Sequence, residues 1–255
     1  MKHHDPEHLR QLLETKVCPK GGLFGVDLSK ANLPKAVLYS SDLREAKLSK
    51  ANLAKADLQE ANLVGADLHG ADLNGANLHQ ANLAQADLSG TLLFFADLHE
   101  ANAPGAILKN ADLTEVDLLH ANLEGADLSG AKLSGAKLRG ANLIGADLSN
   151  ADLSEANLSE ANLSEADLSG ADLREADLSK AVLSQAKLVG ANLHRIRLQG
   201  ADLTDADLTD ANLYGIDLRE AITENTLFEK AKLCNTILPD GKVEYRDCEE
   251  DTAAE

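Results

Sequence analysis

The sequence predicts an all-β solenoid, a parallel β-helix built of stacked square coils, and three observations lead to it. One five-residue phrase repeats from residue 21 to residue 240 without insertion or deletion. Its central residue is Leu in 41 of 44 repeats, and the residue two places earlier is Ala in 35. A period of five fits neither the roughly 3.6-residue turn of an α-helix nor the two-residue alternation of a long strand.

The phrase itself explains a square coil. Between Ala and Leu stands Asp or Asn in 30 of the repeats, so the two apolar side chains point to one side and the polar one to the other. The last two residues of the phrase are mostly polar or Gly and must turn the chain through a corner. Four repeats then close one coil, and 44 repeats give about 11 coils, or a rod of roughly 50 Å at a strand spacing of about 4.8 Å.

The repeated phrases ADLSG, ANLSE and ADLRE resemble the A(D/N)LXX signature of the pentapeptide-repeat family over residues 21–240. The resemblance implies a right-handed quadrilateral β-helix, and the handedness comes from the resemblance alone. The unbroken frame and the segment LLETKVCPKGGLFGVDLSKANL look most like cyanobacterial-type members, most of which have no known activity.

Residues 1–20 are expected to form an N-terminal helical cap, because an open coil would expose apolar Leu and unpaired backbone. Asp5 is a favourable N-cap, Pro6 suits the first helical position, and Leu9, Leu12 and Leu13 would share one face of a helix.

Residues 241–255 are expected to form a C-terminal cap and an acidic tail. Asp240-Gly241 is a turn signal, and Val243 and Tyr245 would lay a short strand over the last coil. The three Cys, at 18, 234 and 248, form no metal-binding pattern, and a Cys234–Cys248 bridge stays open for an oxidising compartment.

The charge is uneven along the chain. The formal net charge is -18, but residues 1–60 carry ten basic and eight acidic residues, so the excess of acid falls entirely on the rest. Such a balance disfavours direct binding of nucleic acid or of an anionic membrane. With a charged start and no apolar run of about 18 residues, the expected compartment is the cytoplasm, or a lumen or periplasm if a leader has been removed.

No catalytic, cofactor or metal site is expected. A filled β-helix without loops offers no pocket, and the sequence has no Gly-rich phosphate loop, HExxH motif or nucleophile elbow. His79, His99, Glu100 and His120 are a possible zinc or nickel set, but side chains on a flat wall seldom converge on one ion. The protein is therefore predicted not to be an enzyme.

Two groups of residues are candidates for binding. Residues 91–110 break the pattern with apolar residues at outward positions, which often marks a contact surface, although local repacking around Pro104 and Ala103 is the alternative. This candidate partner patch consists of Leu92, Phe94, Phe95, Pro104 and Ile107. The candidate acidic face consists of Asp147, Asp152, Glu155, Glu160, Glu165, Asp167, Asp172, Glu175 and Asp177.

These features predict a rigid scaffold that binds another protein, as a monomer or with weak end-to-end or patch-mediated self-association. The alternative is DNA mimicry. The resemblance implies it, because family members linked to fluoroquinolone resistance mimic duplex DNA and bind DNA gyrase. Against it stand the acidic tail, the absence of loops and the basic first coils. Six stacked Asn, at 62, 82, 102, 122, 142 and 162, predict amide ladders that stabilise the stack.

Overall fold

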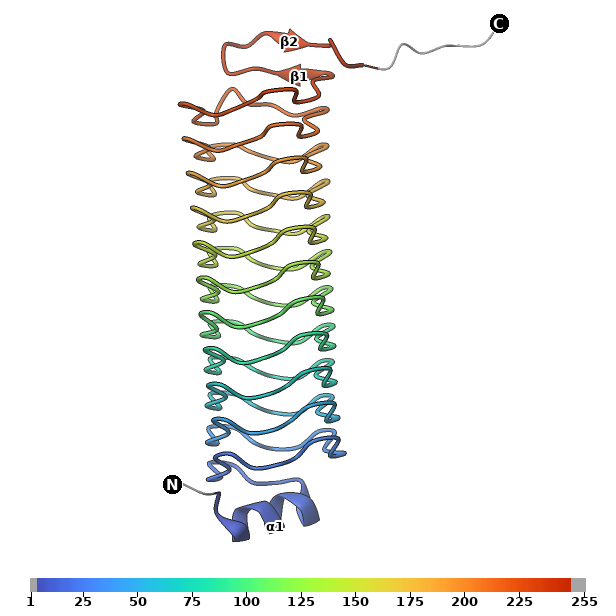
Figure 1. Ribbon diagram of the computed structural model, residues 1–255, viewed down its shortest axis with the longest axis vertical. Helices are drawn as coiled ribbons and strands as arrows, with labels where there is room; N and C mark the ends of the chain where they lie inside the picture. The colour runs from blue at the N-terminus through green and yellow to red at the C-terminus, as the bar shows by residue number, and fades with distance from the viewer. Residues whose placement is uncertain (1–3, 249–255) are drawn as a thin grey trace, which may run out of the picture.

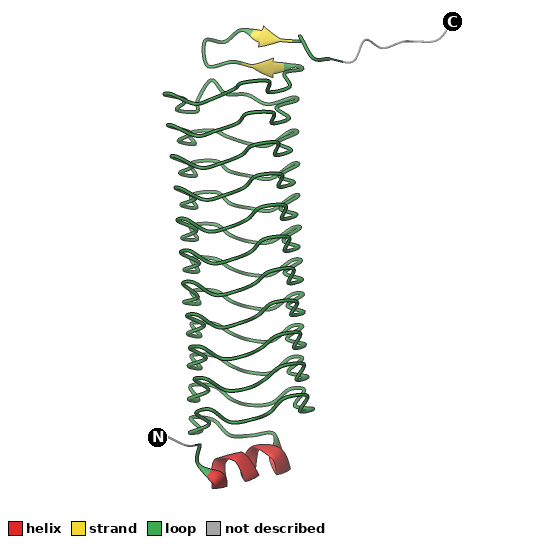
Figure 2. Ribbon diagram, viewed as in Figure 1, coloured by secondary structure: helices red, strands yellow, loops and turns green. Residues whose placement is uncertain are grey.

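The protein is a straight stack of coils with a helix at one end and a hairpin at the other, as seen in a computed structural model that describes residues 4–248 (Figure 1). Helix α1 spans Pro6–Thr15, and strands β1 and β2 span Thr236–Ile237 and Val243–Glu244. The coils between them carry no helix or longer strand (Figure 2), because each wall contributes a single bridging residue before the chain turns again.

Each coil contains 20 residues, as the repeat predicts. The bridging residues pair in parallel with the residue 20 places later, for example Asn62 with Asn82 and Asn82 with Asn102. At each level the central Leu N–H donates upward and the preceding residue's N–H donates downward: Leu63 to the Asn82 carbonyl at 2.7 Å, and Asn82 to the Ala61 carbonyl at 2.9 Å. Residues 20 apart in sequence therefore lie one above another in columns.

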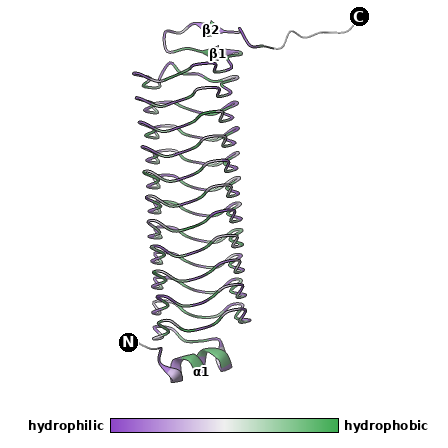
Figure 3. Cartoon of the chain, in the orientation of Figure 1, coloured by the Kyte–Doolittle hydropathy of each residue, from purple (hydrophilic) through white to green (hydrophobic). Residues whose placement is uncertain are grey.

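The interior is an axial column of Leu flanked by Ala. Leu143 and Leu163 are fully buried, as is Ala161, and the same holds along most of the rod, whereas inward residues of the last coil such as Ala221 and Phe228 are only partly buried. The hydropathy of the chain alternates accordingly within every coil (Figure 3). Ala103, which replaces a central Leu, is also buried, at 2% exposure.

The Asp or Asn before each Leu has a structural role that the repeat pattern did not reveal. Its side-chain oxygen accepts a hydrogen bond from the backbone N–H two residues later, as Asp147 does from Ser149 at 2.9 Å and Asn142 from Ile144 at 3.3 Å. This Asx turn supplies an acceptor for a corner N–H that forms no hydrogen bond in the backbone ladder between coils. The side chain thus points outward, as predicted, and caps the corner as well.

Nearly every corner is a tight four-residue turn whose third residue has positive φ. The N–H of Ala66 donates to the Leu63 carbonyl at 2.9 Å, and Gly65 between them has φ 65°. This is the geometry of a type II turn, which favours Gly, yet Glu60 adopts φ 55°. Gly140 has a second reason to be Gly, since a Cβ there would lie 2.5 Å from the Nδ1 of His120, which leans over it.

Helix α1 begins where the sequence predicts, with the Asp5 carboxylate accepting from the Glu7 N–H at 2.9 Å. The Asp5 N–H in turn donates to the Gly22 carbonyl at 2.8 Å, which ties the helix to the first coil. Leu12 is fully buried, whereas Leu13 is 56% exposed. Leu13 is the immediate neighbour of Leu12, so it lies about 100° round the helix and leaves the apolar face.

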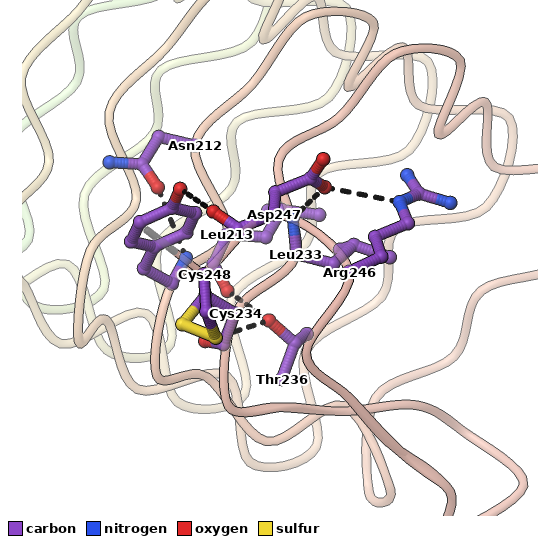
Figure 4. Close-up of a disulfide and its surroundings, with 9 residues drawn as sticks. Asn212, Leu213, Leu233, Cys234, Thr236, Arg246, Asp247 and Cys248 are labelled. Carbon is purple, nitrogen blue, oxygen red and sulfur yellow. Dashed lines mark hydrogen bonds and ion pairs between the residues drawn. A yellow bond between two sulfur atoms is a disulfide. The ribbon is translucent and has the colours of Figure 1, made fainter. Parts of the chain in front are cut away.

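The C-terminal hairpin pairs β1 with β2 in antiparallel register, Ile237 opposite Val243. Cys234 and Cys248 form a disulfide (Figure 4), which the sequence had left open. Beside it the Asp247 carboxylate accepts from the Leu233 N–H at 2.8 Å. Tyr245, expected in the strand, lies just beyond it and is 60% exposed. From residue 249 onward the expected acidic tail lies outside the described residues.

Replacing Leu143 by Ala is expected to lower the free energy of unfolding by about 2–5 kcal/mol, because a fully buried Leu leaves a cavity that its neighbours only partly fill. Chemical denaturation followed by far-ultraviolet circular dichroism measures the loss. The matched control is Leu92→Ala, whose side chain is 44% exposed. Equal destabilisation by the two substitutions would contradict the axial role of the central Leu.

Candidate functional site

Leu92, Phe94 and Phe95 form an apolar projection, here named the aromatic corner. They are 44%, 41% and 60% exposed, and the two ring centroids lie 4.1 Å apart. Leu92 stands where other repeats have Asp or Asn, so this corner lacks its own Asx acceptor. The Phe94 N–H instead donates to the side-chain oxygen of Asn74, one coil below, at 3.0 Å.

Pro104 and Ile107 do not join the aromatic corner. Pro104 follows Phe94 by ten residues, which is half a coil, so it lies at the diagonally opposite corner. Ile107, 41% exposed, follows Leu92 by three quarters of a coil and lies on a wall that borders the corner of Pro104 and not the aromatic corner. The structure thus divides the five residues of the predicted patch into two separate places.

The nine predicted acidic residues form a belt around the rod, here named the acidic belt. Asp147 stacks with Asp167 on one wall and Asp152 with Asp172 on the next, while Asp177 belongs to a third. The glutamates lie at corners: Glu155 and Glu175 share one corner, and Glu160 and Glu165 lie at the two following it. Negative charge therefore lies on three of the four walls and three of the four corners of these two coils rather than on one face of them.

Part of the acidic belt is neutralised within the chain. The Arg174 Nε donates to the Oδ1 of Asp172 at 2.8 Å, and the Arg139 Nη2 donates to the Oε1 of Glu160 at 3.1 Å. Hydrogen bonds from the Arg174 side chain, and then from its backbone N–H, hold the pKa of Asp172 below its ordinary value despite partial burial. Asp172 therefore stays ionised to lower pH than a free Asp.

The His residues stack at one corner but do not form a metal site. The ring centroids of His79 and His99 are 5.2 Å apart, and those of His99 and His120 are 6.2 Å apart. Glu100 accepts hydrogen bonds from the Gln80 amide at 2.6 Å and from His99 at 3.3 Å, which lower its pKa. Among the described residues, no group of three or more His, Cys, Asp or Glu has the geometry to hold a metal ion.

The Asn column forms a ladder over part of its length. The Asn102 amide donates to Asn82 at 3.2 Å, Asn122 to Asn102 at 3.0 Å and Asn142 to Asn122 at 3.0 Å. These bonds confirm that stacked amides bond along the rod. They satisfy side chains that already cap corners, so the column is structural.

The chain belongs to the pentapeptide repeat family. The family pattern "Pentapeptide repeats" matches eight copies in segments that run together from residue 23 to residue 222. This membership agrees with the right-handed β-helix that the resemblance implied. No curated protein shows a significant match to the sequence. Within the part of the chain that the structure describes, no helix has the length and apolar character to cross a membrane.

Several solved structures are similar. HetL, a pentapeptide repeat protein involved in heterocyst differentiation regulation in the cyanobacterium Nostoc sp. strain PCC 7120, is 31% identical, with 95% of this chain and 100% of HetL covered and a TM-score of 0.48. A pentapeptide repeat protein of the Arabidopsis thaliana thylakoid lumen is 34% identical over 42% of this chain and 71% of its own, with a TM-score of 0.32. QnrB1, a plasmid-mediated fluoroquinolone resistance protein, is 22% identical over 71% and 86%, with a TM-score of 0.39.

The Asp172–Arg174 pair predicts a pH dependence. Because the folded-state pKa of Asp172 is lowered, its stabilisation is present above the unfolded pKa of about 3.9 and is lost as the pH falls through the folded value. Asp172→Asn should therefore lose less stability on acidification than the wild type, by a few tenths of a kcal/mol to about 1 kcal/mol. Urea unfolding at neutral pH and near pH 2.5 measures the difference.

The control for this prediction is Asp147→Asn, which keeps the same Asx turn to Ser149 but lies outside the contact between Arg174 and Asp172. An acid-induced loss that is the same in Asp172→Asn as in the wild type would contradict the assigned role of Arg174.

Proposed function

We propose that the protein is a non-catalytic, rigid scaffold that binds another protein through the aromatic corner, without a cofactor and without direct contact to nucleic acid or membrane. The observation that supports this is the pair Phe94 and Phe95, exposed side by side on a rod whose corners are otherwise mostly polar or Gly. Contiguous exposed apolar side chains on a protein surface often mark a binding site, and aromatic residues dominate the energy of such contacts.

The β-helix makes this corner a pre-organised contact. The backbone of each repeat is bonded to the coils above and below, as Phe95 is to the Thr114 carbonyl at 3.3 Å. The two rings therefore project from a frame that loses little conformational entropy on binding. Rigid display of side chains at fixed spacing is the property that a scaffold requires.

Replacing Phe94 and Phe95 together by Ser is expected to remove specific partners from an affinity purification out of the native host, because the apolar contact is lost while the core is unchanged. Loss of two central aromatic contacts corresponds to at least about a hundredfold in affinity. The matched control is Pro104→Ser with Ile107→Ser on the other side of the rod. If the aromatic variant retains the wild-type partner list, the aromatic corner is not the binding site.

A second candidate function is DNA mimicry, favoured by the acidic belt. Residues 141–180 carry nine acidic residues against Arg174 and Lys180, a balance of -7 over two coils. Two coils span about 10 Å, a length over which duplex DNA presents roughly six phosphates. The ion pairs of Asp172 with Arg174 and of Glu160 with Arg139 reduce the density of unpaired negative charge. DNA mimicry therefore ranks second.

DNA mimicry has a direct test against DNA gyrase. The wild type should inhibit supercoiling at stoichiometric concentration and low salt, and a variant with Glu155, Glu160, Glu165 and Glu175 changed to Gln should inhibit at least about tenfold less, because it lacks four corner charges. Supercoiling is followed by gel electrophoresis of the plasmid. Absence of inhibition by the wild type would remove gyrase as the mimic's target.

The Cys234–Cys248 disulfide bears on the compartment, because disulfides persist mainly in oxidising compartments. We keep the cytoplasm as the proposed location, and the redox state of this pair in the native host distinguishes it from a lumen or periplasm.

A further inference from the structure

The charge of the side chains in the corner column that contains Phe95 changes from positive to negative along the rod. Reading every twentieth residue, Lys35 and Lys55 lie below Phe95, and Glu155 and Glu175 lie above it. All five side chains are exposed. A basic segment, an aromatic middle and an acidic segment, beyond which Arg195 follows in the same column, therefore lie in line on one edge of the molecule.

These four charges are free of intramolecular ion pairs. Within the described residues, neither Lys35 nor Lys55 has a carboxylate within 4.0 Å, and neither Glu155 nor Glu175 has a basic nitrogen within that distance. Other charges of the same coils are paired, such as Glu160 with Arg139. The unpaired charges on this corner are thus available to a partner.

We infer that this partner is a second copy of the chain, packed antiparallel along the same corner. The inference rests on the proposed binding role of the aromatic corner and names its occupant. The midpoint in residue number between Lys35 and Glu175 is position 105, and the midpoint between Lys55 and Glu155 is the same position. One two-fold axis at that level therefore places both Lys opposite both Glu, and the symmetry makes each pair twice.

The residues near this axis fit a close approach. Phe95 lies half a coil from the axis, so the Phe95 residues of the two copies are offset by about one coil spacing, roughly 5 Å, and each stands opposite Glu115 of the other copy. Gly75 of one copy stands opposite Gly135 of the other, which removes two side chains from the line of contact. The Glu115 carboxylate leans away from Phe95, with its Oε1 only 2.9 Å from where a Cβ on Gly135 would lie.

The acidic end offers a receptor for Lys35. A hollow of about 190 Å³ at this corner is lined by Glu155, Glu175, Ser154, Arg174 and His194. The Arg174 guanidinium is held on Asp172 at 2.8 Å and forms no ion pair with either glutamate, although its charge still acts on Glu175. Two molecules of net charge -18 repel each other in most orientations. In this antiparallel arrangement the Lys residues of each copy attract the Glu residues of the other at both ends of the contact.

A charge-swap experiment tests the arrangement by sedimentation velocity over a wide range of protein concentration at moderate salt. The wild type should dimerise reversibly, and high salt should weaken the dimer. Lys35→Glu with Lys55→Glu, and separately Glu155→Lys with Glu175→Lys, should each weaken self-association by at least about tenfold. An equimolar mixture of the two variants should associate again, because both ends of the contact become complementary.

The matched control is Lys30→Glu with Lys50→Glu, which makes the same charge change in the same coils on the neighbouring corner and should leave dimerisation unchanged. A monomeric wild type, a control that weakens dimerisation as much, or a mixture that stays monomeric would overturn the inference. A monomeric wild type would leave the proposed scaffold function standing, since the affinity purification with Phe94 and Phe95 variants tests that function separately.

Discussion

The width of the interior is the constraint on which the rest of the structure depends. Four walls face one another across a space that holds one layer of Leu and the methyl groups of Ala, so the chain must return to the same place every 20 residues. The hydrophobic burial of these Leu stabilises the stack only as long as each coil covers the next. A surface arranged in columns follows directly, because every outward side chain has a neighbour one coil above and one below.

This constraint is local in sequence, which is why the architecture was predictable. The period of five, the small residue and the central Leu are all visible without knowledge of the fold, and they predicted the 20-residue register and the outward direction of Asp and Asn. The Asx turns were not predicted, although the signal was present: an Asp or Asn two residues before a corner N–H, as in Asp147 and Ser149. Nor did composition reveal that Glu60 adopts positive φ at its corner.

The candidate sites were harder to predict, because residues that are neighbours on the surface of this fold are 20 residues apart in the sequence. Pro104 follows Phe94 closely in sequence and yet lies half a coil away, at the opposite corner. For the same reason the predicted acidic face is a belt in the structure, since acidic residues five apart in sequence lie on successive walls or at successive corners. Lys35 and Glu175, far apart in sequence, share one edge of the rod.

The two kinds of outward position differ in what they can contribute to binding. Most wall positions are Asp or Asn, and their oxygens are already engaged in capping the next corner, so a partner must compete with an intramolecular bond. Most corner side chains have no such role, Asn74 being an exception, and they project beyond the walls. At the aromatic corner even the wall position is released from capping, because Asn74 of the coil below supplies the acceptor that Leu92 lacks. Specific recognition by this rod is therefore expected to reside in its corner columns, where a few substitutions change the surface without disturbing the stack.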